Sequence, residues 1–140
     1  MAEFKHHFAS VDGMLAFSPD GQTLAGCATE GLITLWDVAA ARIVTNFRGD
    51  VRAVQGLAFS PDGQRLLTGG KDATDVIRLM DLGSRRCVAR LTGPLGDFRL
   101  VEMSADGNTV VAVNMQGTAL LWRAPSWAEI EAAEKGDVSP

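Results

Sequence analysis

The sequence predicts an all-β protein in which one four-stranded unit occurs three times. A five-residue turn motif recurs as FSPDG, FSPDG and MSADG, starting at Phe17, Phe59 and Met103. The aspartates of neighbouring copies lie 42 and 44 residues apart, and each copy ends an apolar run with Leu-Trp or Leu-Met. A repeat of this length is typical of β-propeller blades, each a small four-stranded sheet. We therefore predict three consecutive blades, which amount to half of a propeller.

Within each copy, short apolar runs alternate with turn-forming residues, a pattern that favours short strands over helices. The blades are expected at about 13–47, 53–92 and 98–123. The expected strands are 13–17, 22–28, 32–37 and 42–47 in the first blade, 53–59, 64–70, 76–81 and 86–92 in the second, and 98–103, 108–114 and 118–123 in the third. No fourth strand follows in the third blade.

The Ser-Pro-Asp-Gly sequence suits a tight turn between the first two strands of a blade. Proline presets φ, the Ser and Asp side chains can bond nearby backbone, and glycine accepts a positive φ. The second copy has two extra residues, which alignment places in 71–75. This position is expected to be a turn, since turns tolerate insertions.

The turn motif, combined with Trp-Asp at the end of the third strand, resembles the WD-repeat family of β-propellers over roughly residues 4–123. The segment LWRAPSWAEI at residues 121–130 resembles the end of WD-repeat regions in large bacterial multidomain proteins. The residues that carry the resemblance are Phe17, Asp20, Gly21, Trp36, Asp37, Phe59, Asp62, Gly63, Asp81, Asp106, Gly107 and Trp122. The family's Gly-His pair is replaced by Gly49-Asp50 and Gly93-Pro94. The resemblance therefore implies the fold without the family's buried Asp-His-Ser/Thr-Trp network.

Composition excludes several classes of protein. The net charge is −4 and the basic residues are scattered, which argues against a nucleic-acid partner. No apolar run reaches membrane-spanning length, and the N-terminus lacks the apolar core of a secretory signal, so we expect a cytoplasmic protein. Cys27 and Cys87 are expected to be reduced packing residues.

Three blades are too few to close a ring, because closed propellers have about four to eight. An open stack leaves two end faces bare, with apolar side chains such as Leu24 at one end and Val111 or Val113 at the other. Residues 2–8, which include Phe4 and Phe8, are placed like the outer strand that the third blade lacks. We therefore expect a homodimeric six-bladed ring in which residues 2–8 complete the partner's third blade.

Other origins for the three blades stay open. The chain could be a fragment of a longer propeller, or an engineered half-ring with only a structural, self-assembling role. A nine-bladed trimer is a further possibility, although it exceeds the usual range of blade numbers. The resulting function classes are a protein-binding scaffold and a self-assembling structural unit.

The C-terminal segment changes pattern after Arg123. Residues 124–136 are expected to form a short helix, with Ser126 as N-cap and Glu129 completing a capping box. Residues 137–140 are expected to be a frayed tail.

Residues suited to catalysis are few. His6 and His7 would face opposite sides of a strand, and no histidine recurs beside the turn serines to activate a nucleophile. We expect no enzyme activity, metal or cofactor. The resemblance implies that loops on one face of the ring hold a protein or peptide partner. The candidate binding residues in those loops are Arg52, Lys71, Asp72, Asp75, Asp97, Arg99 and Gln116.

Overall fold

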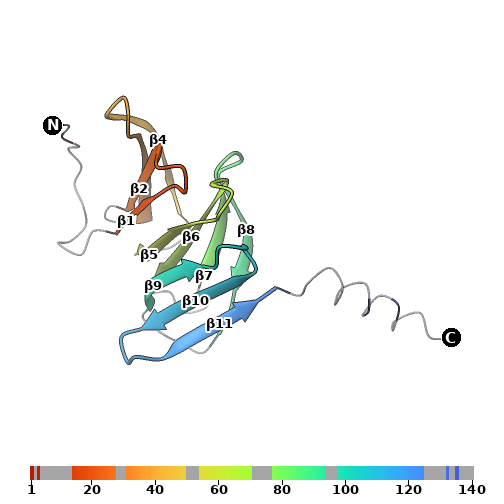
Figure 1. The fold of residues 1–140 in the computed structure, drawn as a ribbon. Coiled ribbons are helices and arrows are strands. Elements are labelled where there is room, and N and C mark those ends of the chain that lie inside the picture. Colours follow the sequence, from red (N-terminus) through yellow and green to blue (C-terminus); the bar gives the residue numbers. More distant parts are fainter. Residues whose placement is uncertain are drawn as a thin grey trace.

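The computed structural model describes residues 1, 3, 14–27, 31–49, 54–70, 77–93, 98–124, 132 and 135. These residues form antiparallel sheets (Figure 1). The first sheet consists of β1 (Leu15–Phe17), β2 (Thr23–Cys27), β3 (Leu32–Asp37) and β4 (Arg42–Arg48). The second consists of β5 (Val54–Phe59), β6 (Arg65–Gly70), β7 (Ile77–Asp81) and β8 (Arg86–Leu91), and the third of β9 (Phe98–Met103), β10 (Thr109–Asn114) and β11 (Ala119–Arg123).

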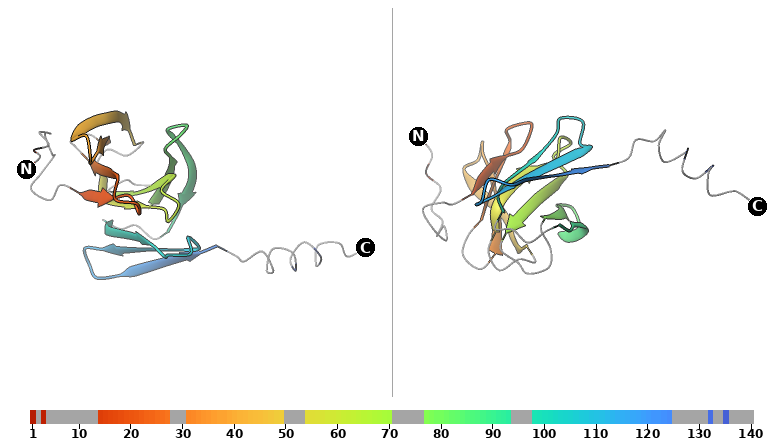
Figure 2. Two further views of the ribbon diagram at one scale, coloured as in Figure 1. Left: turned by 45° about the horizontal axis from the view of Figure 1, so that its top comes forward. Right: turned by 90° about the horizontal axis from the view of Figure 1, so that it is seen from below.

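Each sheet is a meander in which neighbouring strands in the sequence are neighbours in space. The prediction of three successive blades is thus confirmed, and the strand ends agree with the expected ones within two residues. The third sheet has three described strands, in the order β11-β10-β9. Figure 2 shows the sheets following one another, with the second between the first and the third.

The sheets pack face to face through two apolar clusters. One joins the first and second sheets and includes Ala25, Leu35, Leu57 and Phe59. The other joins the second and third and includes Ala58, Leu67, Ile77, Val101 and Val110. The middle sheet is therefore covered on both sides, and five consecutive residues of β6 are buried. Leu57, Phe59 and Leu66 of its inner strands enter the first cluster, and Ala58 and Leu67 enter the second.

The turn motif builds the same hydrogen-bonded structure in each sheet. Ser18 Oγ donates to Asp20 Oδ1 at 2.6 Å, and the same carboxylate oxygen accepts the Gln22 N–H at 3.0 Å. Ser18 Oγ in turn accepts the Thr23 N–H at 2.9 Å. Gly21 has a φ of 71°, which glycine adopts without strain. The predicted roles of serine, aspartate and glycine in this turn are confirmed.

The third sheet is also tied to the second by a tryptophan. Trp122 Nε1 on β11 donates to the carbonyl of Thr92, just beyond β8, at 3.1 Å. This repeat tryptophan thus reaches the residue that follows the outer strand of the preceding sheet.

Several expected features lie outside the described residues. These are the N-terminal strand 2–8 apart from residue 3, the insertion 71–75, almost all of the expected helix 124–136, and the tail 137–140. The helix and the strand exchange stay predictions.

Candidate interaction surfaces

Equivalent positions of the repeat differ in how far their side chains are exposed to solvent. Phe17 and Phe59 hold the same place in the first and second sheets. Phe59 is 9% exposed because the first sheet covers it, whereas Phe17 is 64% exposed. The residues two places earlier behave alike, since Leu57 is 8% and Leu15 53% exposed. The first sheet therefore presents to solvent the side chains that the second sheet buries.

We call this surface the leading end face and define it by the exposed side chains of Leu15 and Phe17; their cross-strand neighbours Leu24 and Trp36 lie on the same side of the sheet. The expectation that Leu24 is one of its bare residues is wrong, because Leu24 is buried. Trp36 is also buried, with its ring so close to Gly26 that a Cβ there would lie 2.7 Å from Cζ3. The exposed apolar surface comes from strand β1, at the sheet edge, and not from the more central strand β2.

The opposite surface belongs to the third sheet. We call it the trailing end face and define it by Leu100, Glu102, Val111, Val113 and Leu121. Leu121 is 68% exposed, whereas Leu35, its equivalent in the first sheet, is buried in a cluster. Leu100 is also exposed, but Val111 and Val113 are half-buried, so they are less bare than expected. The chain thus has two incompletely covered ends.

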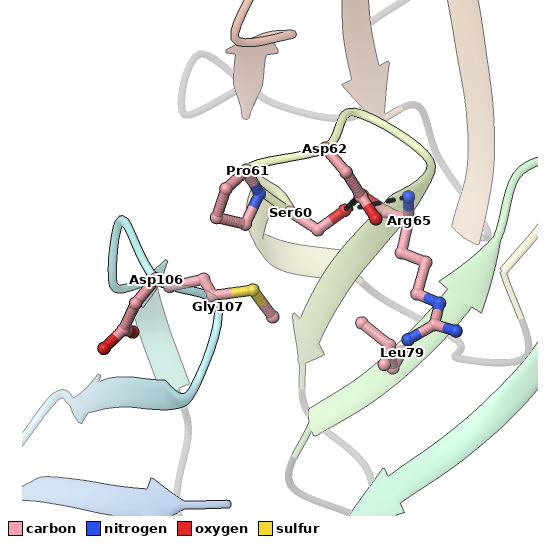
Figure 3. Close-up of a pocket in the computed structure, with 8 residues that line it drawn as sticks. Ser60, Pro61, Asp62, Arg65, Leu79, Asp106 and Gly107 are labelled. Atoms are coloured by element: carbon pink, nitrogen blue, oxygen red, sulfur yellow. Dashed lines mark hydrogen bonds between the residues drawn. The ribbon is translucent and has the colours of Figure 1, made fainter. Parts of the chain in front are cut away.

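A shallow cavity of about 280 Å³ lies where the turns of the second and third sheets meet (Figure 3). Its lining residues are Ser60, Pro61, Asp62, Arg65, Leu79, Met103, Asp106 and Gly107. Ser60 and Ser104 each donate to the aspartate two residues later at 2.5 Å. These hydrogen bonds, with backbone N–H donors, lower the pKa of Asp62 and Asp106 below 3.8.

The carboxylates of this cavity are therefore already used to hold the turns. Asp62 Oδ1 also accepts the Gln64 N–H at 3.0 Å, and Asp106 Oδ1 accepts the Asn108 N–H at 2.9 Å. A general acid needs a carboxyl group whose pKa is raised toward the working pH, and here the shifts run the other way. The cavity's lining residues include no histidine or cysteine. This geometry favours a structural role.

A second cavity, of about 260 Å³, follows the innermost strands of the sheets. It is lined by Leu15, Ala16, Phe17, Pro19, Leu57, Ala58, Phe59 and Glu102. Glu102 is the one charged residue in this lining. It comes from the trailing end face, and the other lining residues come from the first and second sheets.

Most of the predicted loop residues lie outside the described part of the chain. Arg52, Lys71, Asp72, Asp75 and Asp97 lie outside the described residues, as do Phe4 and Phe8. Arg99 and Gln116 are described, and both are exposed. Phe98 pairs with Asn114 between β9 and β10, so Arg99 and Gln116 lie at the same end of the third sheet.

Sequence reasoning missed one buried charge. Arg78 on β7 pairs with Thr68 on β6 and is 5% exposed. Its only sequence signal is a basic residue inside an apolar strand. Burial of a guanidinium group makes this position structurally sensitive.

Two absences hold for the described part of the chain. It contains no helix long and apolar enough to cross a membrane. Among the same residues, no group of three or more His, Cys, Asp or Glu side chains could hold a metal ion.

The fold and its end faces define a protein of consecutive propeller blades. The family model of the WD domain, G-beta repeat, matches residues 1–37 and 41–77, which make up more than half of the chain. The chain belongs to the WD40 family. The third sheet lies beyond these matches, but it repeats the turn geometry of the other two, with Gly107 at a φ of 74°.

Relatives include proteins of animals, of a yeast and of a cyanobacterium. Transducin beta-like protein 3 of Bos taurus is 34% identical over 116 residues, which are 83% of this chain and 14% of that protein. Protein groucho of Drosophila melanogaster is 39% identical over 72 residues, or 51% of this chain and 10% of that protein. An uncharacterized WD repeat-containing protein of Synechocystis is 36% identical over 107 residues, covering 76% of this chain and 30% of that protein. The chain spans less than a third of each of these relatives.

Proposed function

We propose that this protein is a non-enzymatic interaction scaffold that completes its propeller ring by binding a second copy of itself. The observation that carries this proposal is the contrast between Phe17 and Phe59, which are 64% and 9% exposed at the same repeat position. Apolar side chains patterned for burial and left exposed mark an interface. The loops of the completed ring are then free to hold a protein or peptide.

The chain contains both halves of the contact that this assembly needs. Its second sheet presents Leu57 and Phe59 to the first sheet, and its third presents Val101 and Met103 to the second. The leading end face carries Leu15 and Phe17 at those positions. The trailing end face of a second copy would pack against Leu15 and Phe17 in the way that the first sheet packs against Leu57 and Phe59. Two copies make a six-bladed ring, which is within the usual range, while three copies exceed it.

The family match supports a role for the N-terminus in this contact. The second matched unit starts at residue 41, directly before the outer strand β4. The first matched unit starts at residue 1, so residues 2–8 hold the corresponding place in the repeat. The third sheet has no described outer strand, and residues 2–8 of the second copy would supply it, with Phe4 and Phe8 in the new contact.

A specific observation favours one alternative. The relatives are several times longer than this chain, so the missing blades could come from a longer polypeptide of which these three are a part. In that case the two end faces are contacts within one chain, and the unit has only a structural role by itself.

Light scattering on the purified chain across a dilution series tests the proposal. The expected mass is twice that of the chain, and Phe17→Asp should reduce it to a single chain. Val88→Asp is a matched control, since Val88 is 51% exposed but lies on β8, the outer strand of the middle sheet, and on neither end face. A single-chain mass for the unmodified protein at every concentration, or a dimer that survives Phe17→Asp, would contradict the proposal.

The loop face requires a separate test. Lys71→Ala combined with Arg99→Ala should remove a partner that the unmodified ring captures, with the assembly mass unchanged. A partner that binds the double variant equally well would exclude this face.

A further inference from the structure

We propose that Glu102 makes the contact between two copies weaker than the contacts between sheets of one chain, so that the ring opens and closes at this contact while each chain stays folded. This inference rests on the proposed self-association. We call the contact between the trailing end face of one copy and the leading end face of another the closing contact.

The repeat shows what position 102 normally contains. Ala16, Ala58 and Glu102 hold the same place on the inner strands β1, β5 and β9. Ala16 packs against the cluster between the first and second sheets, and Ala58 belongs to the cluster between the second and third. Both alanines therefore face the following sheet. Glu102 is the one member of the three that carries a charge, and it is exposed on the trailing end face.

Sheet packing within the chain indicates what Glu102 would meet. Gly56 on β5 lies against Val101 on β9, across the contact between the second and third sheets. In the closing contact, the corresponding positions belong to the third sheet of one copy and the first sheet of the other. Leu100 takes the position of Gly56, and Leu15 of the second copy takes the position of Val101. The alternation of side chains along a strand then sets Glu102 beside Leu15 and Phe17 of the second copy.

A carboxylate in this place is unfavourable. Leu15 and Phe17 offer no hydrogen bond, and β1 contains no lysine or arginine to pair with the charge. Removing an ionised carboxylate from water without a partner has a large cost. The contacts that bury Ala16 and Ala58 have no such cost, so the three contacts of a chain are unequal.

The inner cavity lowers this cost without removing it. Within the single chain, Glu102 lines this open cavity at the inner strands, so its carboxylate can stay partly hydrated when the ring closes. The closing contact is therefore weakened but still possible. This combination gives an assembly that exchanges subunits.

Dilution series of the full chain and three variants, followed by sedimentation velocity, test the inference. Glu102→Ala should tighten self-association by about tenfold for each closing contact, hence about a hundredfold for a dimeric ring with two. Glu102→Gln should tighten it less, because an amide is polar but uncharged. Glu102→Lys should not tighten it, because a charge of the opposite sign is equally costly to bury.

The Lys variant separates this effect from overall charge. Net charge falls in magnitude from −4 to −3 in Glu102→Ala and to −2 in Glu102→Lys, since −4 + 1 = −3 and −4 + 2 = −2. If weaker general repulsion were the cause, the Lys variant would tighten most, and that result would overturn the inference. The melting temperature of each variant at low concentration shows whether the single chain is folded.

The remaining outcomes distinguish this inference from the proposed function. A dimer that Phe17→Asp dissociates, but that Glu102→Ala does not tighten, would overturn the role of Glu102 and leave self-association standing. An unmodified chain that is monomeric at every concentration, with a Glu102→Ala variant that dimerises, would overturn self-association of the unmodified protein and show that Glu102 opposes the closing contact. A chain that is monomeric in every variant would overturn both proposals.

Discussion

Gly56 on β5 lies so close to Val101 on β9 that a Cβ at position 56 would fall 2.7 Å from Cγ2 of Val101. Real Cβ atoms essentially never approach another heavy atom so closely. The second and third sheets therefore meet with the backbone of one against a side chain of the other. Val101 is 3% exposed, and the described sheets leave it little room to move away.

Gly56→Ala should destabilise the fold by about 1–3 kcal/mol, because the added methyl group overpacks this contact. Urea unfolding, followed by tryptophan fluorescence, measures the change. Gly83→Ala is the matched control, since a Cβ there would make only an ordinary contact, 3.5 Å from Asp81 Oδ2. Equal stability of the two variants would show that the sheets do not pack as described.

Acid should weaken the fold through the repeated turns. The serine hydroxyl and a backbone N–H lower the pKa of Asp20, Asp62 and Asp106 below 3.8, the value for an unperturbed aspartate. A lowered pKa in the folded state means that the stabilisation is fully present above the unfolded pKa. It is lost as the pH falls through the lower folded values. The urea concentration at the midpoint of unfolding should therefore decrease as the pH is lowered below about 4.

Asp106→Asn identifies this cause. The side chain at position 106 can no longer titrate in this variant. The variant should therefore be less stable than the unmodified protein at neutral pH and approach it in stability as the pH falls. A stability difference between the two proteins that is constant from neutral pH to about pH 2 would exclude the turn as the origin.

The two cysteines should differ in reactivity. Cys27 is buried between the first and second sheets, and burial raises its pKa to about 11. The reactive thiolate is then only about one part in ten thousand at neutral pH. Cys87 is half-buried, and its Sγ donates to the carbonyl of Ala89 at 3.3 Å.

Iodoacetamide should thus label Cys87 first, and Cys27 only when urea opens the contact between the sheets. Mass spectrometry of the digested protein gives both rates. Equal labelling in native buffer would mean that Cys27 is accessible and that the first two sheets separate readily.

The turn between β3 and β4 contains strain that glycine would relieve. Ala41 has a φ of 51°, and an L-residue in this region costs roughly 1–2 kcal/mol. Ala41→Gly should raise the stability by about 0.5–1 kcal/mol, since part of the gain is offset by the greater freedom of the unfolded chain. Ala39→Gly, in the same turn but without a positive φ, should lower it, and a melting curve for each variant checks both signs.

Local sequence was sufficient for most of the fold. The spacing of Asp20, Asp62 and Asp106 predicts the repeat, and the alternation of apolar runs with turns predicts strands that match the described ones within two residues. These features depend on interactions between residues close in the chain, such as the hydrogen bond from Ser18 to Asp20. Turn chemistry of this kind is visible in any copy of the motif.

The end faces depend on which sheet lies against which, and only the tertiary structure decides that. Phe17 and Phe59 occur in the same five-residue motif, yet one is exposed and the other buried because a sheet covers only the second. Leu24, the cross-strand partner of Phe17, is buried, although its place on the leading end face suggested otherwise. The burial of Arg78 likewise appears only in the folded sheets. The contact of Gly56 with Val101 brings together two residues that are far apart in the sequence. Burial is a property of neighbours in space, so a single repeat cannot reveal it.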